Sequence, residues 1–323
     1  MKNSVIMATY NGEKYIIEQL DSIKNQTLPP DEVIICDDCS IDNTSGIVED
    51  YISRYGLTGW HLFKNAENIG FYDNFFKALR LCTGDVIYLS DQDDVWDLDK
   101  IKVFTTHYNA NSKLMMVQSR FRFIDSKGNR LKEEEYYHYI KTGHICDLST
   151  IDMCKFAGSG FTMSFRAEVV NKVISNNLDK YRIFPFHDIL IGLMSVAIGD
   201  CIMDRNVIDN HRIHENNVTK KKNKSFISGR TKQKQLDILD LRIEYFKVIA
   251  KYSVNENKKK DFLRYALFCQ QRLDYIHRCN VRKLVDLFHC RDMYASKTGV
   301  IADTMYSIGL EKILLLLLKI RKV

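Results

Sequence analysis

The first hundred residues alternate short apolar runs with longer segments whose apolar side chains recur at helical spacing. Runs at 4–10, 32–36, 60–63 and 85–90 predict buried strands, and residues 13–24 carry isoleucine and leucine at a helical period. This β-α-β-α-β-α-β order predicts a parallel, doubly wound sheet with right-handed crossovers, flanked by helices. The chain should therefore have an α/β fold, in which ligands bind beyond the carboxyl ends of the strands.

Polar and acidic loops follow three of the predicted strands. The sequence TYNG stands after the first strand at 9–12, DDCSIDNT after the second at 37–44, and DQDD after the fourth at 91–94. Because the carboxyl ends of parallel strands meet along one edge of a sheet, we expect these loops to lie together. That edge is where the functional residues should collect.

The fourth-strand loop concentrates negative charge. Three carboxylates within four positions, Asp91, Asp93 and Asp94, repel one another, and a bound cation would offset that cost. Mg²⁺ and Mn²⁺ take oxygen ligands and often hold the phosphates of a substrate. Asp91 and Asp93 are two residues apart at a strand end, so both could reach one metal ion. The alternative is that Asp93 or Asp94 only caps the helix that begins near Asp97.

Asp37 and Asp38 close the second strand, where a carboxylate can accept hydrogen bonds from a ribose hydroxyl or a base N–H. No G-x-G-x-x-G follows the first strand and no G-x-x-x-x-G-K-[ST] occurs, so neither a dinucleotide fold nor a P-loop is expected. Cys36 and Cys39 form a C-x-x-C. The sequence has no second C-x-x-C to complete a structural zinc site, and polar turn residues follow, which disfavours zinc and redox roles.

The composition is that of an ordinary globular protein, with 45% hydrophobic and 27% charged residues among 323. The net charge of +6 is weak evidence for nucleic acid and is compatible with anionic substrates or an anionic membrane surface. Nine cysteines, and an N-terminus without the apolar core of a signal peptide, favour reduced thiols and a cytoplasmic location. No stretch reaches the roughly 20 apolar residues of a membrane span.

The pattern changes in the second hundred residues. A hairpin is predicted with its turn at 125–129, and a glycine-marked loop at 155–165 leads into another strand. Residues 184–200 form an apolar helical segment with His187 and Asp188 at its start. A carboxylate at the start of a helix is either a cap or a functional group.

A basic stretch separates two predicted domains. Between residues 220 and 234 seven are Lys or Arg and none is Asp or Glu, so we place a domain at 1–220 and a helical extension at 221–323. The stretch is either a solvated linker or a loop that closes over a diphosphate. Six consecutive apolar residues, 313–318, then have Lys and Arg on both sides. We expect this tail to lie in a membrane interface with its cations on lipid phosphates; the alternative is a terminal helix packed on the domain.

Four motifs occur together in an order found in one known family. They are ATYNG (8–12), DDCSIDNT (37–44), NIGFYDN (68–74) and LSDQDDVW (89–96). Together they resemble the family 2 glycosyltransferases of the GT-A fold, over roughly residues 3–220. SDQDDVW followed by HRIHENN at 211–217 is most similar to the bacterial rhamnosyltransferases that build O-antigens and capsules.

The resemblance implies transfer of a sugar from a nucleoside diphosphate donor with Mg²⁺ or Mn²⁺ as cofactor. It implies nucleotide-sugar contacts from Thr9, Tyr10, Asn11, Asp37, Asp38, Asn68, Gly70, Asn74, Ser90, Asp91 and Gln92. It implies metal ligands at Asp91, Asp93 and His214, and acceptor-side residues at Gly158, Ser159, Trp96 and His187. For His214 the alternative is a hydrogen-bonded structural histidine.

Asp188 is the implied catalytic base of an inverting transfer, in which it removes the proton of the attacking acceptor hydroxyl. His187 occupies a place that such enzymes often give to Glu, so the usual acidic pair has one member here. One carboxylate is enough for the reaction. The alternative is that Asp188 only caps its helix.

We favour L-rhamnose from dTDP-rhamnose as the donor sugar, with UDP-glucose or UDP-galactose as the alternative. The acceptor would be a lipid-linked or growing cell-surface polysaccharide, and the protein would be peripheral on the inner face of the cell membrane, without a nucleic-acid partner. A nucleotidyltransferase shares such a sheet but would carry a glycine-rich loop with Lys or Arg where this chain has TYNGEKY. An inactive scaffold of a polysaccharide assembly complex is a third possibility, against which the retained Asp91, Asp93 and Asp188 argue.

Overall fold

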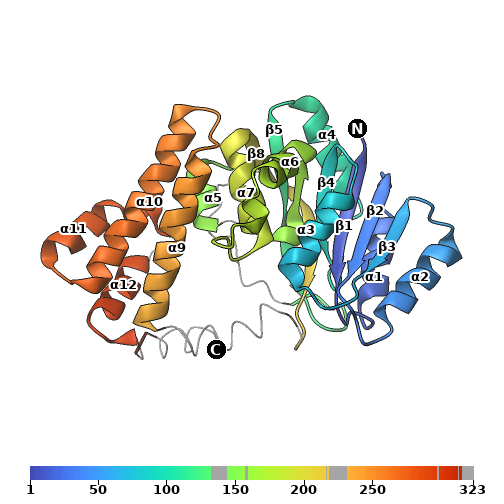
Figure 1. Ribbon diagram of the computed structural model, residues 1–323, viewed down its shortest axis with the longest axis horizontal. Coiled ribbons are helices and arrows are strands. Elements are labelled where there is room, and N and C mark those ends of the chain that lie inside the picture. The colour runs from blue at the N-terminus through green and yellow to red at the C-terminus, as the bar shows by residue number, and fades with distance from the viewer. Residues whose placement is uncertain are drawn as a thin grey trace. The chain divides into compact units, whose positions relative to one another are not determined.

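The structure is a computed structural model that describes residues 1–131, 144–156, 159–215, 217, 231–296, 298–311 and 313–314. The chain divides into two compact units, shown in Figure 1. The sheet unit comprises Met1–Ser149 and Ala157–Ile213, and the helical unit comprises Thr150–Phe156 and His214–Val323. The domain boundary predicted at residue 220 lies outside the described residues.

The sheet unit is built on a mixed sheet. Among the described residues it has eight strands in the order β3-β2-β1-β4-β7-β5-β8-β6. The first four strands of the chain pair in parallel, which confirms the predicted β-α-β order. β7 is antiparallel to β4 and β5, β8 is parallel to β5, and β6 is antiparallel to β8. The strands are β1 (Asn3–Thr9), β2 (Glu32–Asp37), β3 (Trp60–Lys64), β4 (Val86–Asp91), β5 (Leu114–Ile124), β6 (Ile145–Asp147), β7 (Met163–Arg166) and β8 (Asp200–Arg212).

Helices cover both faces of this sheet, and a separate group of helices forms the second unit. In the sheet unit they are α1 (Ile16–Lys24), α2 (Thr44–Tyr55), α3 (Phe71–Leu81), α4 (Lys100–Ala110), α6 (Ala167–Ser175) and α7 (His187–Ile198), with 3-10 turns η1 (Gly160–Thr162) and η2 (Leu178–Lys180). In the helical unit they are α5 (Thr150–Phe156), α9 (Lys232–Ala250), α10 (Glu256–His277), α11 (Val281–His289), η3 (Arg291–Met293) and α12 (Gly299–Ser307).

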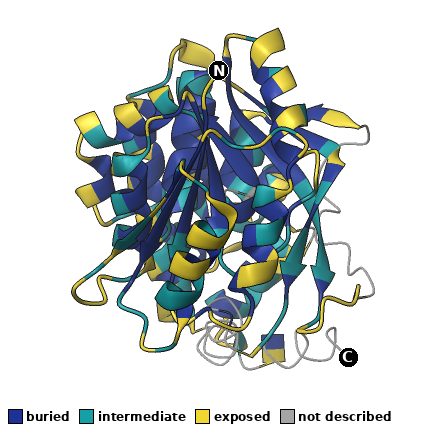
Figure 2. Ribbon diagram, turned by 90° about the vertical axis from the view of Figure 1, so that its right-hand side faces the viewer, coloured by how far each residue is buried: buried dark blue, intermediate teal, exposed yellow. Residues whose placement is uncertain are grey.

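The hydrophobic core lies between the sheet and its helices. Because side chains alternate along a strand, Val5 and Met7 of β1 face one side, where they join a buried cluster with Leu20 of α1 and Phe104 of α4. Ile6 faces the other side, where α3 packs on β1 and β2. Figure 2 shows the sheet as a buried layer and the outer surfaces of the helices as exposed. β1, β2 and β4 are therefore buried on both faces, as their continuous apolar sequence predicts, whereas the edge strand β3 is only partly buried.

The turn predicted at 125–129 is confirmed. The Asp125 backbone N–H donates to the Asn129 carbonyl, the Leu131 backbone N–H donates to the Phe123 carbonyl, and Ile124 forms an antiparallel bridge with Arg130. Residues 132–143, in which the second strand of the hairpin would continue, lie outside the described residues. β5 also pairs with β7 and β8, and β8 continues to Arg212.

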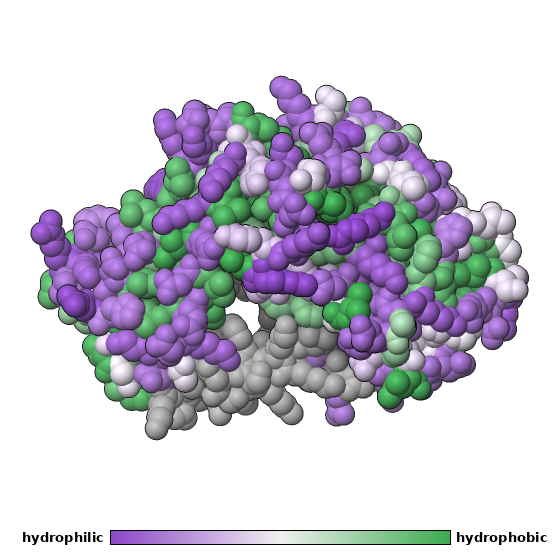
Figure 3. Space-filling view, in the orientation of Figure 1, coloured by the Kyte–Doolittle hydropathy of each residue, from purple (hydrophilic) through white to green (hydrophobic). Residues whose placement is uncertain are grey.

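Among the residues that the structure describes, no helix is long and apolar enough to cross a membrane. On the face drawn in Figure 3, hydrophilic residues spread over the surface of each unit, and smaller hydrophobic patches are interspersed among these residues. This surface is typical of a protein that buries most of its large apolar side chains.

A fully buried ion pair joins β8 to the start of α4, directly after the loop that follows β4. The Lys100 ammonium lies 2.7 Å from the Asp209 carboxylate, and both side chains are 0% exposed. The backbone N–H of Asp97 donates to the same carboxylate at 3.2 Å, and the ammonium stands 4.0 Å from the centre of the Trp96 ring. These contacts fix the 91–99 loop against the far half of the sheet.

We predict that Asp209→Asn destabilises the fold by about 3–5 kcal/mol, because it leaves a buried ammonium without its carboxylate. The free energy of unfolding in urea measures the effect. The matched control is Glu49→Gln, which breaks the exposed Lys64–Glu49 pair of 2.8 Å and should cost under about 1 kcal/mol. Equal losses in the two variants would contradict a special role for the buried pair.

Candidate functional site

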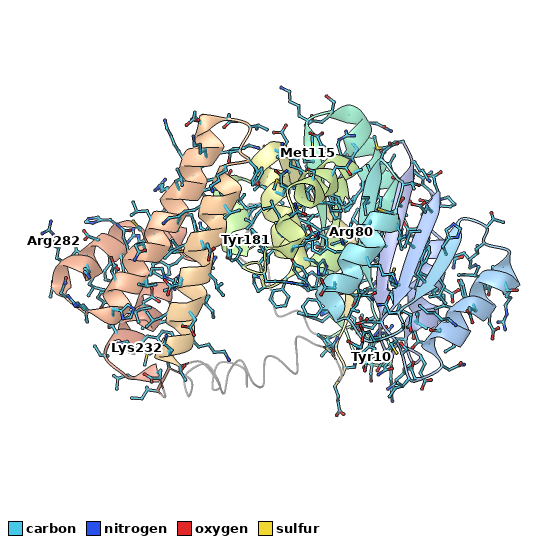
Figure 4. All side chains as sticks on the ribbon, in the orientation of Figure 1. Tyr10, Arg80, Met115, Tyr181, Lys232 and Arg282 are labelled. Atoms are coloured by element: carbon cyan, nitrogen blue, oxygen red, sulfur yellow. The ribbon has the colours of Figure 1, made fainter. Side chains whose placement is uncertain are left out.

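The carboxyl ends of β1, β2 and β4 meet, as the sequence predicts. Thr9 stands beside Asp37 in the register of β1 and β2, and Ala8 stands beside Asp91 in the register of β1 and β4. Figure 4 shows Tyr10 at this end of the sheet, among closely spaced side chains. The predicted loops after these strands therefore share one edge.

A network of hydrogen bonds ties the first loop to the loops after β2 and β4. The Gln92 side-chain amide accepts from the Tyr10 backbone N–H at 2.9 Å and donates to the Tyr10 carbonyl at 3.0 Å. A side chain at Gly12 would collide with this amide, because an added Cβ would lie only 2.2 Å from Gln92 Oε1. Asn11, at a positive φ of 50°, accepts from the backbone N–H of Ile41. Tyr10 is left 46% exposed at the edge.

Two buried carboxylates, Asp37 and Asp38, order the loops beside the end of β2. Asp37 accepts from Thr9 Oγ1 at 2.9 Å and from the backbone N–H of Ser40 at 2.9 Å. Asp38 accepts from the backbone N–H groups of Ile69 and Gly70, both at 2.8 Å. Each carboxylate thus fixes the conformation of a loop by accepting hydrogen bonds from the backbone N–H groups of that loop.

The predicted nucleotide contacts separate into an exposed and an enclosed group. Tyr10, Asn11 and Asn68 are exposed, and Gly70, Asp91 and Gln92 are half-buried. Five others are 0–3% exposed and hydrogen-bonded within the protein: Thr9, Asp37, Asp38, Asn74 and Ser90. Their contact with a nucleotide stays a prediction, and their bonds in this structure order the edge.

The acidic loop after β4 is held by the end of β8. Asp94 is 0% exposed, and its Oδ1 accepts from His211 Nδ1 and from the Arg212 backbone N–H, both at 2.9 Å. Within the described residues its Oδ2 has no hydrogen-bond partner. The Arg212 guanidinium, itself fully buried, donates to the Asp93 carbonyl at 2.9 Å and to Glu18 at 2.5 Å. Asp94 therefore supports the loop rather than capping a helix.

The charges of this cluster perturb one another. Burial and the carboxylates of Asp94 and Asp93, with a smaller contribution from Asp188, raise the pKa of Asp91 well above its ordinary value. Burial alone would lower the pKa of His211, but the carboxylates of Asp94, Asp91 and Asp93 outweigh it and raise that pKa to about 9. His211 is therefore an imidazolium at neutral pH, and it offsets only part of the negative charge.

The sequence analysis singled out His214 in the HRIHENN motif, but the structure places His211 against the acidic loop. A signal was present, because Asp209 and His211 are two residues apart and therefore point to the same side of a strand. His214 begins the second segment of the helical unit, and its backbone N–H donates to Asn217 Oδ1 at 2.5 Å. Its role as a metal ligand stays a prediction.

Asp188 lies at the start of α7 on the same edge. Its Oδ2 accepts from the Gly160 backbone N–H at 3.1 Å and its Oδ1 from the Ile189 backbone N–H at 2.8 Å. Burial raises the pKa of Asp188 to about 6, and these two hydrogen bonds oppose the rise. Asp188 is not the N-cap of α7, because that position is Phe186. The simple capping explanation is therefore wrong.

Two of the predicted acceptor-side residues have buried rings. The His187 ring is 7% exposed and stacks on Phe75 with centroids 3.9 Å apart; burial lowers its pKa to about 3, so it is neutral. Trp96 is 2% exposed inside the core. Contact of either ring with an acceptor stays a prediction. Ser159 is half-buried beside Asp188's partner Gly160, and Gly158 lies outside the described residues.

The acidic edge fits a hard divalent cation with a phosphate ligand. Among the described residues no group of three His, Cys, Asp or Glu is arranged to enclose a metal by itself. Mg²⁺ is usually held by only one or two carboxylates, with substrate phosphates and waters completing the sphere. The like charge around Asp91, which His211 does not balance, is the feature that a cation would relieve.

Comparison with known proteins gives the family. The model of the family "Glycosyl transferase family 2" matches residues 4–172. The dTDP-rhamnosyl transferase RfbG of Shigella flexneri is 29% identical over 226 residues, which cover 65% of this chain and 72% of RfbG. TarS of Staphylococcus aureus, a poly(ribitol-phosphate) beta-N-acetylglucosaminyltransferase, is 39% identical over 104 residues, covering 32% of this chain and 18% of TarS. The chain thus spans about a fifth of the first curated relatives that it matches.

Solved structures show the same fold. TarS 1–349 in complex with UDP-GlcNAc superposes with a TM-score of 0.62 at 17% identity, covering 96% of this chain and 89% of that one. The mannosyltransferase PcManGT of Pyrobaculum calidifontis, in complex with GDP-Man and Mn²⁺, gives 0.52 at 17% identity, with 98% and 87% covered. These neighbours confirm the predicted GT-A fold with helices after it. The family match covers more than half of the sequence, and the chain therefore belongs to glycosyl transferase family 2.

Proposed function

We propose that this glycosyltransferase transfers L-rhamnose from dTDP-rhamnose to a lipid-linked or growing cell-surface polysaccharide, with inversion at the anomeric carbon and with Mg²⁺ or Mn²⁺. One observation carries the mechanism: two carboxylates, Asp91 and Asp188, share one sheet edge in different environments. Asp91 stands in a cluster of like charge, whereas Asp188 is held by two backbone N–H groups. Such a division of environments is typical of residues with separate acid–base and electrostatic tasks.

Asp188 has the properties of a general base. With a pKa of about 6 it is mainly ionised at neutral pH and still basic enough to take a proton. It accepts the proton of the acceptor hydroxyl while that oxygen bonds to the anomeric carbon and the bond from this carbon to the diphosphate oxygen breaks. Its backbone donors aim the carboxylate without neutralising it, because neither is a cation.

Asp91 and Asp93 are the residues that would hold the metal ion. When bound, that ion supplies positive charge to the diphosphate as it departs. His211 and Arg212 hold the acidic loop in place for this task through Asp94 and the Asp93 carbonyl. Tyr10, exposed at the end of β1, offers a ring on which a nucleobase can stack.

The donor is supported by the likeness to RfbG, whose name gives dTDP-rhamnose, and by the HRIHENN motif. UDP-glucose or UDP-galactose is the second candidate, and the TarS complexes with UDP and UDP-GlcNAc favour a uridine nucleotide. An inactive scaffold is the third. A panel of nucleotide sugars with Mn²⁺ tests all three: hydrolysis or transfer of dTDP-rhamnose alone is expected, a UDP-sugar alone would replace the donor, and turnover of none would favour the scaffold.

A membrane surface on the cytoplasmic side is part of the proposal. The chain ends in an apolar run with basic neighbours, residues 310–323, of which 312 and 315–323 lie outside the described residues. Such a tail suits anionic lipid. Co-sedimentation with anionic vesicles should decrease when residues 310–323 are removed, and unchanged co-sedimentation would exclude the tail as the anchor.

We predict that Asp188→Asn lowers kcat by about 10²–10⁴-fold, because the amide cannot accept the proton. Binding of the donor nucleotide, measured by calorimetry, should stay within about twofold, since the amide keeps the size of the side chain. The matched control is the exposed Asp50, whose change to Asn should leave both quantities unaltered.

The pH profile provides a second readout of the same prediction. Because Asp188 is protonated below a pKa of about 6, kcat/KM should fall roughly tenfold for each pH unit below that value. This acid limb should be absent from the residual activity of Asp188→Asn. An unchanged limb in the variant would assign the titration to another group and remove Asp188 as the base.

We predict that Asp93→Ala removes the metal-dependent part of nucleotide binding. The dissociation constant of the nucleoside diphosphate in Mn²⁺ should rise to the value that the wild type shows in a chelator. Circular dichroism should show an unchanged fold, because Asp93 is half-buried and its carbonyl still accepts from Arg212. Full affinity in Mn²⁺ would contradict the metal role, and Asp50→Asn again serves as the control.

A further inference from the structure

The helical unit contains a cavity of its own. Its volume is about 880 Å³, and its walls come from α9, α10, α12 and the segment that leads into α12. The walls are largely apolar and include Ile238, Leu239, Ile301, Met305, Tyr306 and Leu314. This size and lining are typical of a binding site for a small molecule. The cavity lies entirely within the helical unit, and the proposed transfer reaction does not use it.

One charged pair in the wall is already neutralised. Arg272 donates to the two oxygens of Asp303 at 2.7 and 3.0 Å, and the Tyr294 hydroxyl donates to Asp303 at 2.6 Å. Asp303 is 0% exposed. Because the guanidinium and the carboxylate face each other in a bidentate arrangement, this pair leaves no net charge for a ligand.

A second guanidinium in the wall has no such partner. Arg242 donates to the Cys154 carbonyl at 2.6 Å, is hydrogen-bonded to the Tyr245 side chain, and lies 5.7 Å from the ring centres of Phe246 and Tyr265. Among the described residues these neighbours are neutral, and the buried Nε of this half-buried side chain has no hydrogen-bond partner. An anion beside this cation would therefore be favourable. Lys234 lines the same cavity and adds to the positive charge.

The charge of the surrounding chain favours an anion as well. Residues 214–323 contain 24 Lys and Arg against 11 Asp and Glu, whereas the sheet unit contains 22 against 29. The chain's own tail is the other apolar candidate, because leucines 315–318 follow the wall residue Leu314. That tail also brings Lys319, Arg321 and Lys322, which would add cations to a wall that needs an anion.

We propose that this cavity binds an anionic amphiphile, a phosphate ester carried on an apolar chain, with the phosphate at Arg242 and Lys234 and the chain along the apolar wall. A guanidinium and an ammonium suit a phosphate group, since each donates charge-assisted hydrogen bonds. The apolar wall supplies the binding free energy for the chain. The ligand is either a lipid-linked precursor or a bilayer lipid, which share this chemistry.

The test uses the full-length protein and decyl phosphate below its micellar concentration, followed by calorimetry. Saturable binding with one site is expected, and Arg242→Gln should weaken it at least tenfold. The uncharged pentaethylene glycol decyl ether should bind more weakly and should not distinguish the variant from the wild type. The matched control is Lys247→Gln on the exposed side of α9, which should change decyl phosphate binding less than twofold. Ala302→Phe, which fills the cavity, should abolish binding of both probes.

Three results would overturn the proposal. The first is equal loss of both probes in Arg242→Gln, which indicates a damaged fold rather than a lost charge. The second is binding of decyl phosphate only after removal of residues 315–323, which indicates that the tail occupies the cavity. The third is failure of both farnesyl phosphate and phosphatidylglycerol vesicles to displace decyl phosphate. Displacement by farnesyl phosphate supports a lipid-linked precursor, and displacement by the vesicles supports a bilayer lipid.

Discussion

Repulsion among the carboxylates after β4 is the constraint on which the site depends. The chain places Asp91, Asp93 and Asp94 at the end of a buried strand, where they would push one another apart. β8 prevents this with two consecutive residues: His211 pairs with Asp94, and Arg212 binds the Asp93 carbonyl. The conformation of the acidic loop is therefore fixed by His211 and Arg212, two cationic residues of a strand that follows more than 100 residues later in the chain.

The buried polar residues of β8 have partners of their own. Asp209 pairs with the buried Lys100, Arg212 pairs with the exposed Glu18, and Asp204 is hydrogen-bonded to His107. Lys100 and His107 belong to α4 and Glu18 to α1, so these contacts tie both helices to β8. Loss of either Asp209 or Lys100 would leave the other buried and unpaired, which links the stability of the fold to the geometry of the site.

The sequence predicted the first half of the fold well because its strands are continuous apolar runs buried on both faces. It did not predict β8 to Arg212, because hydropathy treats Asp204, Asp209 and Arg212 as surface residues and contains nothing about their partners. The motif resemblance assigned Trp96 to the acceptor side, and hydropathy could not show that the Lys100 ammonium lies over its ring inside the core. The hydrophobic pattern of the strands was enough to predict Asp91 at the edge of the sheet. Asp188 was predicted there only from the motif resemblance, because the pairing of distant strands leaves no signal in the neighbouring sequence.

The polar groups of the edge divide into those that the protein satisfies and those that it does not. Asp37 and Asp38 receive backbone donors, and Asp188 receives two, so the loops are ordered before any ligand binds. Asp91 stands apart: burial and then the neighbouring carboxylates raise its pKa, and His211 opposes the rise. Because a metal ion binds the ionised carboxylate, a cation at this edge would compete with protonation of Asp91. The acidic edge should therefore gain its affinity for a diphosphate only together with the metal ion, because without one the carboxylates repel the phosphates that they would otherwise hold in place.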